Sequence, residues 1–277
     1  MHDFNNKTVI ITGGSEGVGA ATARKFAAAG ANLVLVGRSK RKLDRIVTEL
    51  RSSTQVRPVA MDVSDADACA NLFKIAEYDF SAVHVLINNA GYHQRGPVSA
   101  VPAEDLGRMI DVNLRAPIIL CRLALPYLQK ADGGAAIVNV ASLAGRLPVN
   151  GAATYSASKF GLRVFTFALG DELRGSGIKL AAVSPGPIDT GFIMANIDSV
   201  ADITFSQPLS TAEAVADEIV ALCVNRKRER SMPPISGGLT MLSYLFPGLS
   251  RTLQPLMERR GRKIKRQLKA KTMEKSA

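Results

Sequence analysis

The amino-acid sequence predicts a single α/β domain of the Rossmann type, a doubly wound parallel sheet of about seven strands with helices on both faces. Short apolar runs recur along the chain and alternate with helical patterns, as buried parallel strands alternate with their crossover helices. A glycine-rich turn follows the first apolar run, where a helix opens. A length of 277 residues is sufficient for one such domain with a large buried core.

Each element is expected from its local pattern. The expected strands are residues 7–12, 32–36, 56–61, 83–87, 136–141, 179–184 and 231–235. The expected helices are residues 17–29, 40–52, 65–77, 154–174 and 211–224. Asp65 is a candidate N-cap, and a long helical region covers residues 103–130, where we expect Pro117 and Pro126 to kink or end its pieces. The carboxyl ends of parallel strands meet at one edge of the sheet, which predicts the ligand site there.

Cysteine, histidine and apolar patterns exclude several classes of protein. Cys69, Cys121 and Cys223 lie far apart without a CxxC pair, so we expect neither a disulfide framework nor a structural zinc. The three histidines are scattered, and no metal is expected. Residues 1–7 lack the apolar run of a signal peptide, and no stretch reaches the roughly 18–20 apolar residues of a spanning helix. These patterns predict a cytoplasmic protein.

The net charge of +11 is concentrated near the C-terminal end. Residues 251–277 contain ten Lys or Arg and two Glu, a charge of +8, which leaves +3 for residues 1–250. A nucleic-acid-binding domain carries its positive charge on a binding face, whereas the body of this chain is close to neutral. Nucleic acid is therefore not expected as a partner.

A glycine-rich loop predicts a phosphate-binding site. Residues 12–19 (TGGSEGVG) follow the first expected strand and open the first helix. Glycines permit a tight turn and let the backbone approach a pyrophosphate, which the helix N-terminus attracts. From this loop alone, a strand–helix turn without a ligand remains the alternative, and the β-α-β setting favours the binding site.

Two residues after the second strand indicate which dinucleotide binds. Folds that bind NAD place Asp or Glu about 20 residues after the glycines, against the ribose 2′-hydroxyl. This chain has Gly37 there, followed by Arg38. A carboxylate would repel a 2′-phosphate, whereas a guanidinium can pair with it bidentately. We therefore expect NADP(H), with Arg38 at the phosphate and Ser15 within reach of it.

The segment YSASK, residues 155–159, predicts acid–base chemistry. Tyr155 and Lys159 are four residues apart, so on a helix they share one face and can point into the same cleft. A phenol with an ordinary pKa of about 10 is a poor proton donor or acceptor at neutral pH. A nearby ammonium stabilises the phenolate and would bring that proton within reach. A chance pair on an exposed helix is the alternative for these two residues taken alone.

Together these motifs resemble those of the short-chain dehydrogenase/reductase family. The resemblance covers roughly residues 7–225 and includes the T-G-x-x-x-G-x-G loop, the segment NNAG at residues 88–91, the Y-x-x-x-K pair and the segment PGPIDT at residues 185–190. One feature departs from the pattern, because Glu16 stands where some NADP-dependent relatives carry a basic residue. The resemblance implies hydride transfer between nicotinamide and a ketone or secondary alcohol without a metal.

The resemblance also implies roles for single residues. Tyr155 would protonate the carbonyl oxygen during reduction, and Lys159 would bind the nicotinamide ribose. Ser142 would hydrogen-bond the substrate oxygen, and Asn113 would hold a water in the proton relay. Asp62 would contact adenine, although a turn residue is the alternative there. The residues expected to bind NADP(H) are Thr12, Gly13, Ser15, Gly17, Val18, Gly19, Arg38, Asp62, Val63, Asn89, Ala90, Gly91, Tyr155, Lys159, Pro185, Gly186, Ile188 and Thr190.

We expect residues 1–235 to form the catalytic domain and residues 236–277 an extension. Residues 239–257 are strongly apolar and a basic run follows. In one interpretation the apolar residues cover the substrate cleft or form a subunit contact, and the basic tail is solvated. In the other, residues 239–277 make peripheral contact with a membrane, the apolar part resting in the bilayer surface and the Lys and Arg side chains meeting anionic lipid.

The substrate is expected to be hydrophobic. The layout of the last part of the chain is similar to that of relatives that reduce lipid-like ketones, such as 3-ketosphingoid, 3-ketoacyl or steroid-like compounds. Residues 191–210, which select the substrate in this family, are irregular and indicate nothing further. The family also suggests a homodimer or homotetramer formed through the two long helical regions.

Two other functions remain open. The chain could be a catalytically silent NADP(H)-binding sensor or a membrane-docking protein, because a fold alone does not fix a function. The complete set of Asn113, Ser142, Tyr155 and Lys159 favours an enzyme.

Overall fold

The computed structural model describes residues 3–189, 197 and 200–276, without the side chains of residues 249, 250, 253 and 270–276. Its centre is a sheet of seven parallel strands in the order β3-β2-β1-β4-β5-β6-β9. The strands are β1 (Thr8–Thr12), β2 (Asn32–Gly37), β3 (Val56–Ala60), β4 (Val85–Asn88), β5 (Ala135–Val140), β6 (Ile178–Pro185) and β9 (Glu229–Met232). The order reverses between β1 and β4, which creates the crevice in which such sheets bind ligands.

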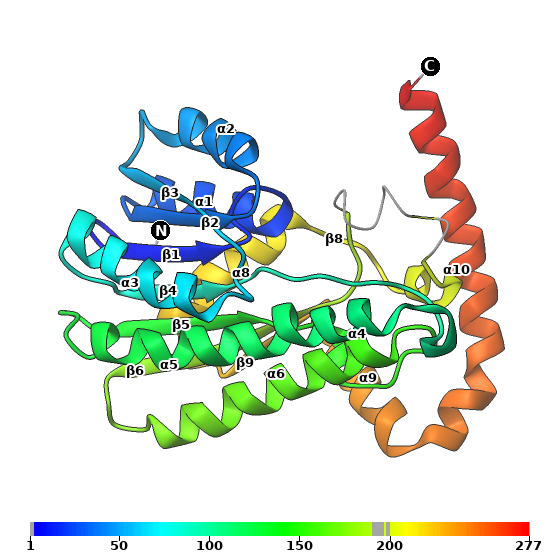
Figure 1. The fold of residues 1–277 in the computed structure, drawn as a ribbon. Helices are drawn as coiled ribbons and strands as arrows, with labels where there is room; N and C mark the ends of the chain where they lie inside the picture. Colours follow the sequence, from blue (N-terminus) through cyan, green and yellow to red (C-terminus); the bar gives the residue numbers. More distant parts are fainter. Residues whose placement is uncertain (1–2, 190–196, 198–199, 277) are drawn as a thin grey trace.

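Helices cover both faces of the sheet, as Figure 1 shows. The core on one face contains residues of α1 (Gly17–Ala28), α2 (Lys40–Leu50) and α8 (Ala212–Val224). The core on the other contains residues of α3 (Ala66–Phe80) and α5 (Ala116–Leu128), with α6 (Ala153–Glu172) packed against it. Alternate residues of one strand serve the two cores: Val9 and Ile11 face the first and Ile10 faces the second. The doubly wound α/β fold is thus confirmed.

Most of the expected elements form close to their predicted bounds. Asp65 caps α3 as predicted, because its carboxylate accepts hydrogen bonds from the amides of Asp67 and Ala68 at 3.0 and 3.1 Å. The last strand is displaced: β9 ends at Met232, whereas the sequence predicted residues 231–235. Pro233 and Pro234 explain the difference, because a proline has no N–H for the ladder and is favoured at the first turn of a helix. Accordingly, α9 (Pro234–Leu245) begins there.

The long helical region is interrupted at an unexpected place. It consists of α4 (Ala103–Ile110), a π-helical turn η2 (Asp111–Arg115) and α5. Pro117 lies in the first turn of α5, and Pro126 lies inside α5, two residues before its end. A proline at position 117 has no N–H to donate to the carbonyl of Asn113, four residues earlier. The widened turn therefore falls on Asn113, one of the predicted catalytic residues.

The remaining elements lie beyond the carboxyl ends of the strands. They are η1 (Val98–Ala100), η3 (Leu143–Gly145), η5 (Asp202–Ser206) and the short parallel pair β7 (Ile188–Asp189) and β8 (Ser210–Thr211). The last helix, α10 (Pro247–Ser276), stands across the end of the molecule toward which the β1 arrow points, and its C-terminal part projects from the body (Figure 1).

Candidate active site

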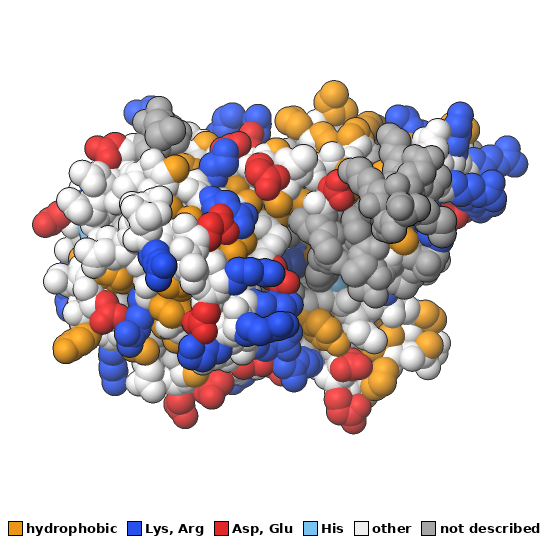
Figure 2. Space-filling model, turned by 90° about the horizontal axis from the view of Figure 1, so that it is seen from above, with side chains coloured by type: hydrophobic (Ala, Val, Ile, Leu, Met, Phe, Trp, Pro, Cys, Tyr) orange, Lys and Arg blue, Asp and Glu red, His pale blue; other side chains and the backbone are white. Residues whose placement is uncertain are grey.

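A large cleft runs along the carboxyl edge of the sheet. It has a volume of about 2310 Å³ and is lined from the glycine loop at one end to α9 and α10 at the other. Pockets for one drug-sized ligand measure about 300–1,000 Å³, so this cleft has room for a dinucleotide and a second molecule. In Figure 2 the surface is hollowed near the middle of the view, and Lys and Arg side chains gather on one side of the hollow.

The glycine loop has the backbone that a phosphate site requires. Gly13 and Gly17 have φ angles of +66° and +51°, in the left-handed region that side chains disfavour. A Cβ at Gly19 would overlap the carbonyl oxygen of Gly13, so only glycine lets the helix start so close to the loop. The carboxylate of Glu16, at the N-cap of α1, turns instead to Lys42, whose Nζ lies 2.7 Å away. The first amides of α1 thus remain directed at the cleft, as anion binding requires.

The loop is fastened to the segment that follows β4. The Thr12 hydroxyl oxygen accepts hydrogen bonds from the amides of Asn89 and Ala90, both at 3.0 Å. The Asn89 side-chain amide donates to the carbonyls of Thr12 at 2.8 Å and Gly13 at 3.2 Å. Two motifs that lie far apart in the sequence are therefore one rigid piece of the site.

One end of the cleft, beside the glycine loop, has an arginine and no acidic side chain at the end of β2. Gly37 stands at the end of β2, and a Cβ there would lie 3.3 Å from Oγ of Ser15, so no acidic side chain occupies the space beside the loop. Arg38 lines the same end, is exposed, and makes no ion pair with the described residues. Lys42 is already paired with Glu16. Arg38 and Arg45, which both line this end and are exposed, are therefore the cations there that enter no ion pair among the described residues.

Asp62 lies at the same end and is held by several partners. Its carboxylate accepts hydrogen bonds from the amide and hydroxyl of Ser64 at 3.0 and 2.8 Å and pairs with Arg108 at 2.9 Å. Burial acts to raise the pKa of Asp62, and the hydrogen bonds from Ser64 act against it. The charges of Arg108 and Arg38 lower the pKa further, so the net direction is downward and Asp62 is ionised at neutral pH.

The four predicted catalytic residues meet near the middle of the cleft. Tyr155 and Lys159 lie on one face of α6, and the Lys159 Nζ is 5.9 Å from the Tyr155 ring centre. Ser142, two residues after the end of β5, is close enough to Tyr155 for its hydroxyl to act on the phenol and lower its pKa. Asn113 reaches the same place from η2: a Cβ at Gly91 would lie 3.6 Å from its Oδ1 and 3.7 Å from the Lys159 Nζ.

The Asn113 side chain joins η2 to the segment after β4. Its Oδ1 accepts a hydrogen bond from the Tyr92 amide at 2.7 Å, and its Nδ2 donates to the Tyr92 carbonyl at 2.7 Å and to Ser158 Oγ at 3.3 Å. Ser158 in turn donates to the carbonyl of Tyr155 at 2.7 Å. The buried Asn113 carboxamide therefore fixes the position of the helix that carries Tyr155.

Burial controls the protonation of the two central groups. It lowers the pKa of Lys159 to about 8, so this side chain is an ammonium at pH 7. Burial is also the largest influence on Tyr155 and raises its pKa, while the Ser142 hydroxyl and the charge of Arg95 act in the opposite direction. The net direction is opposite to the lowering expected from a neighbouring ammonium. Lys159 instead donates to the Val140 carbonyl at 2.9 Å.

The far side of the cleft contains the segment after β6. Pro185, Gly186 and Ile188 line the cleft, and the Gly186 amide donates to the Met232 carbonyl at 2.7 Å, which ties this segment to the end of β9. Thr190, also predicted to bind the cofactor, lies outside the described residues.

Several site residues were missed by the sequence reasoning. The His93 ring stacks on the Tyr155 ring, with centroids 4.0 Å apart and 11° between the planes. Burial lowers the pKa of His93 to about 3, and the charges of Arg95 and Lys159 act in the same direction, so the imidazole is neutral at pH 7. Arg95 and Arg108 also line the cleft. No periodic pattern marks His93 or Arg95, because both lie in a loop.

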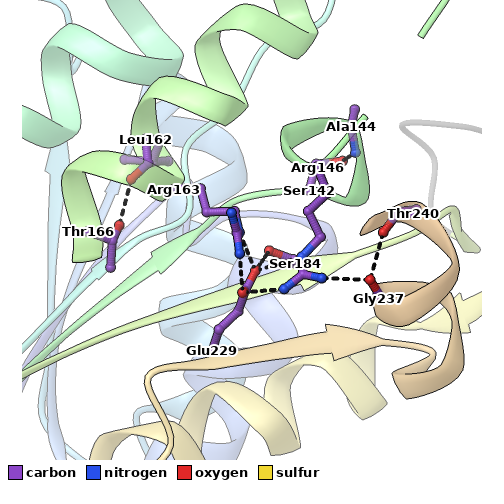
Figure 3. A network of polar contacts seen from close by, with 10 residues as sticks. All are labelled: Ser142, Ala144, Arg146, Leu162, Arg163, Thr166, Ser184, Glu229, Gly237 and Thr240. Carbon is purple, nitrogen blue, oxygen red and sulfur yellow. Dashed lines mark hydrogen bonds and ion pairs between the residues drawn. The ribbon is translucent and has the colours of Figure 1, made fainter. Parts of the chain in front are cut away.

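A buried ionic cluster supports the loop that carries Ser142 (Figure 3). Glu229 on β9 binds Arg146 at 2.5 and 3.1 Å and Arg163 at 2.8 and 2.9 Å, and accepts a hydrogen bond from Ser184 at 2.7 Å. Arg146 also donates to the Gly237 carbonyl at 2.7 Å. The cluster therefore links the Ser142 loop to β6, α6, β9 and α9.

Neither a metal-binding group of side chains nor a membrane-spanning helix is found among the described residues. Among the described residues, no group of three or more His, Cys, Asp or Glu side chains is placed to hold a metal ion. Within the same residues, no helix combines the length and the apolar character needed to cross a bilayer.

The chain is similar to known oxidoreductases. The family model described as short chain dehydrogenase matches residues 7–200. Sulfoacetaldehyde reductase 2 of Chromohalobacter salexigens is 36% identical over 187 residues, which are 67% of this chain and 74% of that protein. An uncharacterized oxidoreductase of Staphylococcus aureus is 31% identical over 215 residues, 78% of this chain and 91% of that protein.

A solved structure shares the fold over most of its length. The structure of a short-chain dehydrogenase/reductase from Burkholderia phymatum in complex with NAD superimposes with a TM-score of 0.80 at 27% identity, covering 90% of this chain and 97% of that one. Enzymes with this fold bind a nicotinamide cofactor and act on small molecules. This chain belongs to the short-chain dehydrogenase/reductase family of oxidoreductases.

Proposed function

We propose that this protein is an NADP(H)-dependent carbonyl reductase that uses Tyr155 as its general acid. The observation that supports the proposal most strongly is the meeting of Tyr155, Lys159, Ser142 and Asn113 in the middle of a cleft whose one end fits a dinucleotide phosphate. A protein that only binds nucleotide would not require a buried phenol with a serine hydroxyl beside it.

The residues present fit a bound dinucleotide. Gly13, Ser15, Gly17, Val18 and the amides at the start of α1 would hold the pyrophosphate, with Thr12, Gly19 and Asn89 keeping the loop in shape. Arg38 would pair with the 2′-phosphate, beside Asp62 and Val63 at the adenine. Ala90, Gly91, Tyr155, Lys159, Pro185, Gly186 and Ile188 would surround the nicotinamide riboside, and Thr190 remains a prediction. When bound, the nicotinamide supplies the hydride.

The protein's own residues would supply the proton. Because burial raises the pKa of Tyr155, the phenol is protonated at neutral pH and can donate to a carbonyl oxygen as negative charge develops on it. Ser142 would hydrogen-bond the same oxygen and so stabilise that charge. The Lys159 ammonium would stabilise the phenolate that remains and return a proton to it. This arrangement favours reduction at neutral pH.

The lining of the substrate part of the cleft supports a hydrophobic carbonyl compound. Leu147, Val149, Leu239, Tyr244 and Met257 line it. Their apolar surface would be covered by a lipid-like ketone, such as a 3-ketosphingoid, 3-ketoacyl or steroid-like compound, and this burial would provide binding free energy.

A short anionic aldehyde is a second candidate substrate. Two relatives are named sulfoacetaldehyde reductases. Arg95 favours this candidate, because its charge acts on Tyr155 and it lines the cleft. A sulfonate or carboxylate next to the reacting carbonyl would pair with such a guanidinium.

We also propose contacts with other partners. Ile118 on α5 and Val164 on α6 are exposed, which supports a homodimer or homotetramer through these helices.

Ile235, Leu245 and Phe246 on and after α9 are 78%, 62% and 55% exposed, and basic α10 follows. This pairing of apolar and basic surface suits a peripheral contact with an anionic membrane. Co-sedimentation with phosphatidylserine vesicles that is lost in 0.5 M salt tests the membrane contact; equal recovery with neutral vesicles would contradict it.

A panel of carbonyl substrates tests the proposed function. The purified protein is supplied with NADPH or NADH and with carbonyls graded from short anionic aldehydes to long-chain and steroidal ketones. We expect NADPH oxidation to exceed NADH oxidation and to rise with apolar size. Activity confined to short anionic aldehydes would replace the lipid-like substrate by the second candidate. No turnover with any carbonyl, together with measured NADPH binding, would favour a sensor.

A further inference from the structure

The basic part of α10 packs against η5 rather than extending freely into solvent. Gly261, in the middle of α10, is buried, and a Cβ built on it would overlap the carbonyl oxygen of Asp202 in η5. Glycine inside a helix is less favourable than alanine, so its presence there needs a reason. The close approach of two backbones is the physical reason for a glycine at this position.

Ionic and polar contacts fix the same junction. Asp202 pairs with Arg262 at 3.1 Å and with Lys265 at 3.4 Å. The Lys265 Nζ also donates to the Val200 carbonyl at 2.6 Å, and its side chain is only 13% exposed. Ion pairs that are partly withdrawn from water and supported by hydrogen bonds are more persistent than exposed surface pairs.

An apolar cluster lies beneath these contacts. Val200 and Phe205 are buried, and Ile264 and Leu268 of α10 pack against them. Lys265 also lies over the Phe205 ring, 5.9 Å from its centre. Ile264 and Leu268 of the basic segment thus form part of a small core with Val200 and Phe205.

The seated helix contributes to the substrate part of the cleft. From α10, Gln254, Met257, Arg260 and Lys265 line it, and η5 adds Asp202 and Ile203. Removing α10 from η5 would therefore open this part of the cleft to water. The glycine loop and Arg38 lie at the other end and would keep their surroundings.

We propose that Gly261 is a specificity-determining position, because it seats α10 on η5 and the seated helix forms the wall that binds the distal part of a bulky substrate. This inference rests on the proposed reductase function. A substrate that reaches α10 gains contact with Met257 and Gln254, whereas a short carbonyl bound at Tyr155 does not need that wall.

Gly261→Ala tests the proposal, with Gly248→Ala as its matched control. Both substitutions place alanine in α10, Gly248→Ala in its first turn and Gly261→Ala in its interior, but a Cβ at Gly248 meets no described atom within 4 Å. We expect Gly261→Ala to lower kcat/KM for the largest accepted ketone by about tenfold, which corresponds to about 1.4 kcal/mol, since overpacking forces the two backbones apart. Its kcat/KM for the shortest accepted carbonyl and its Kd for NADPH should stay within twofold of wild type. Asp202→Asn, which weakens both ion pairs without adding volume, should act in the same direction.

Amide hydrogen exchange gives a readout that does not depend on activity. We expect faster exchange in residues 200–206 and 257–268 of Gly261→Ala than of Gly248→Ala. Unchanged exchange would overturn the seating role. Faster exchange with equal losses for large and short carbonyls would overturn the role in specificity. If wild type turns over no carbonyl, the proposed function fails, and the exchange result still reports whether Gly261 seats the helix.

Discussion

At the scale of single residues, Gly37 and Arg38 are the basis for proposing NADP(H) rather than NAD(H). Gly37 leaves the space beside Ser15 free of a carboxylate, and the Arg38 guanidinium is available at the same end of the cleft. Lys42, a few residues later, is paired with Glu16 and so contributes less positive potential. Arg38, which directly follows Gly37, is therefore the residue at which the proposed cofactor preference is tested.

Arg38→Ala is expected to weaken NADPH binding about tenfold or more and NADH binding less than twofold, because a charge-assisted pair with a 2′-phosphate is worth roughly 1.5–3 kcal/mol. Isothermal titration calorimetry with each dinucleotide measures both Kd values. Arg41→Ala is the control, since Arg41 is exposed on α2 and does not line the cleft. Equal losses for NADPH and NADH would remove Arg38 from the phosphate site.

Spacing in the sequence was enough to bring some site residues together. Tyr155 and Lys159 are four apart on a helix, and Ser142 follows a buried strand, so their common location follows from regular geometry. His93 and Arg95 reach Tyr155 from an irregular loop, whose path depends on contacts distant in the sequence. The raised pKa of Tyr155 was not predictable either, because it depends on how completely the phenol is buried.

At the scale of elements, the core strands and helices followed from apolar periodicity, and the exceptions involve prolines. Pro117 moves the helical irregularity to η2, and Pro233 with Pro234 ends β9 early and starts α9. Both effects come from a missing backbone N–H, which apolar periodicity does not register. The sequence analysis expected Pro117 and Pro126 to kink or end helical pieces, but Pro126 lies inside α5. It also continued the last strand through Pro233 and Pro234, which instead end β9 and start α9.

The Glu229 cluster is the element-scale feature with the clearest energetic consequence. Burial alone would raise the pKa of Glu229, but hydrogen bonds from Arg163, Arg146 and Ser184 outweigh it and lower the pKa to about 2. A carboxyl whose pKa is lowered in the folded state stabilises the fold above its unfolded pKa. This contribution is lost as the pH falls from about 4.5 to about 2.

Glu229→Gln is expected to lower the free energy of unfolding by about 3 kcal/mol at pH 7, because two buried arginines lose their counter-charge. The difference from wild type should shrink as the pH is lowered from 4.5 toward 2. Urea unfolding followed by circular dichroism at several pH values measures it. Glu77→Gln, which removes an exposed pair with Lys130, should cost at most about 0.5 kcal/mol. A loss for Glu229→Gln that is the same at pH 3 and pH 7 would contradict the ionic origin.

At the scale of the whole molecule, the sequence predicted one doubly wound domain, and the structure confirms it. The fate of the C-terminal extension was not predictable in the same way. The positive charge of residues 251–277 suggested a solvated tail or a membrane contact. Instead, Gly261, Ile264 and Lys265 of α10 pack on η5. The mid-helix Gly261 was the local signal of a close approach, but its partner lies about 60 residues earlier in the chain. The exposed apolar face of α9 remains available for the proposed membrane contact.

The most direct test of the central claim compares wild type with Tyr155→Phe, using the carbonyl that the panel identifies. The substitution removes one hydroxyl and keeps the ring that stacks on His93. We expect turnover to fall by at least about 100-fold, the lower range for loss of a positioned general acid, while the Kd for NADPH stays within about twofold. Near wild-type turnover by Tyr155→Phe would contradict Tyr155 as the proton donor.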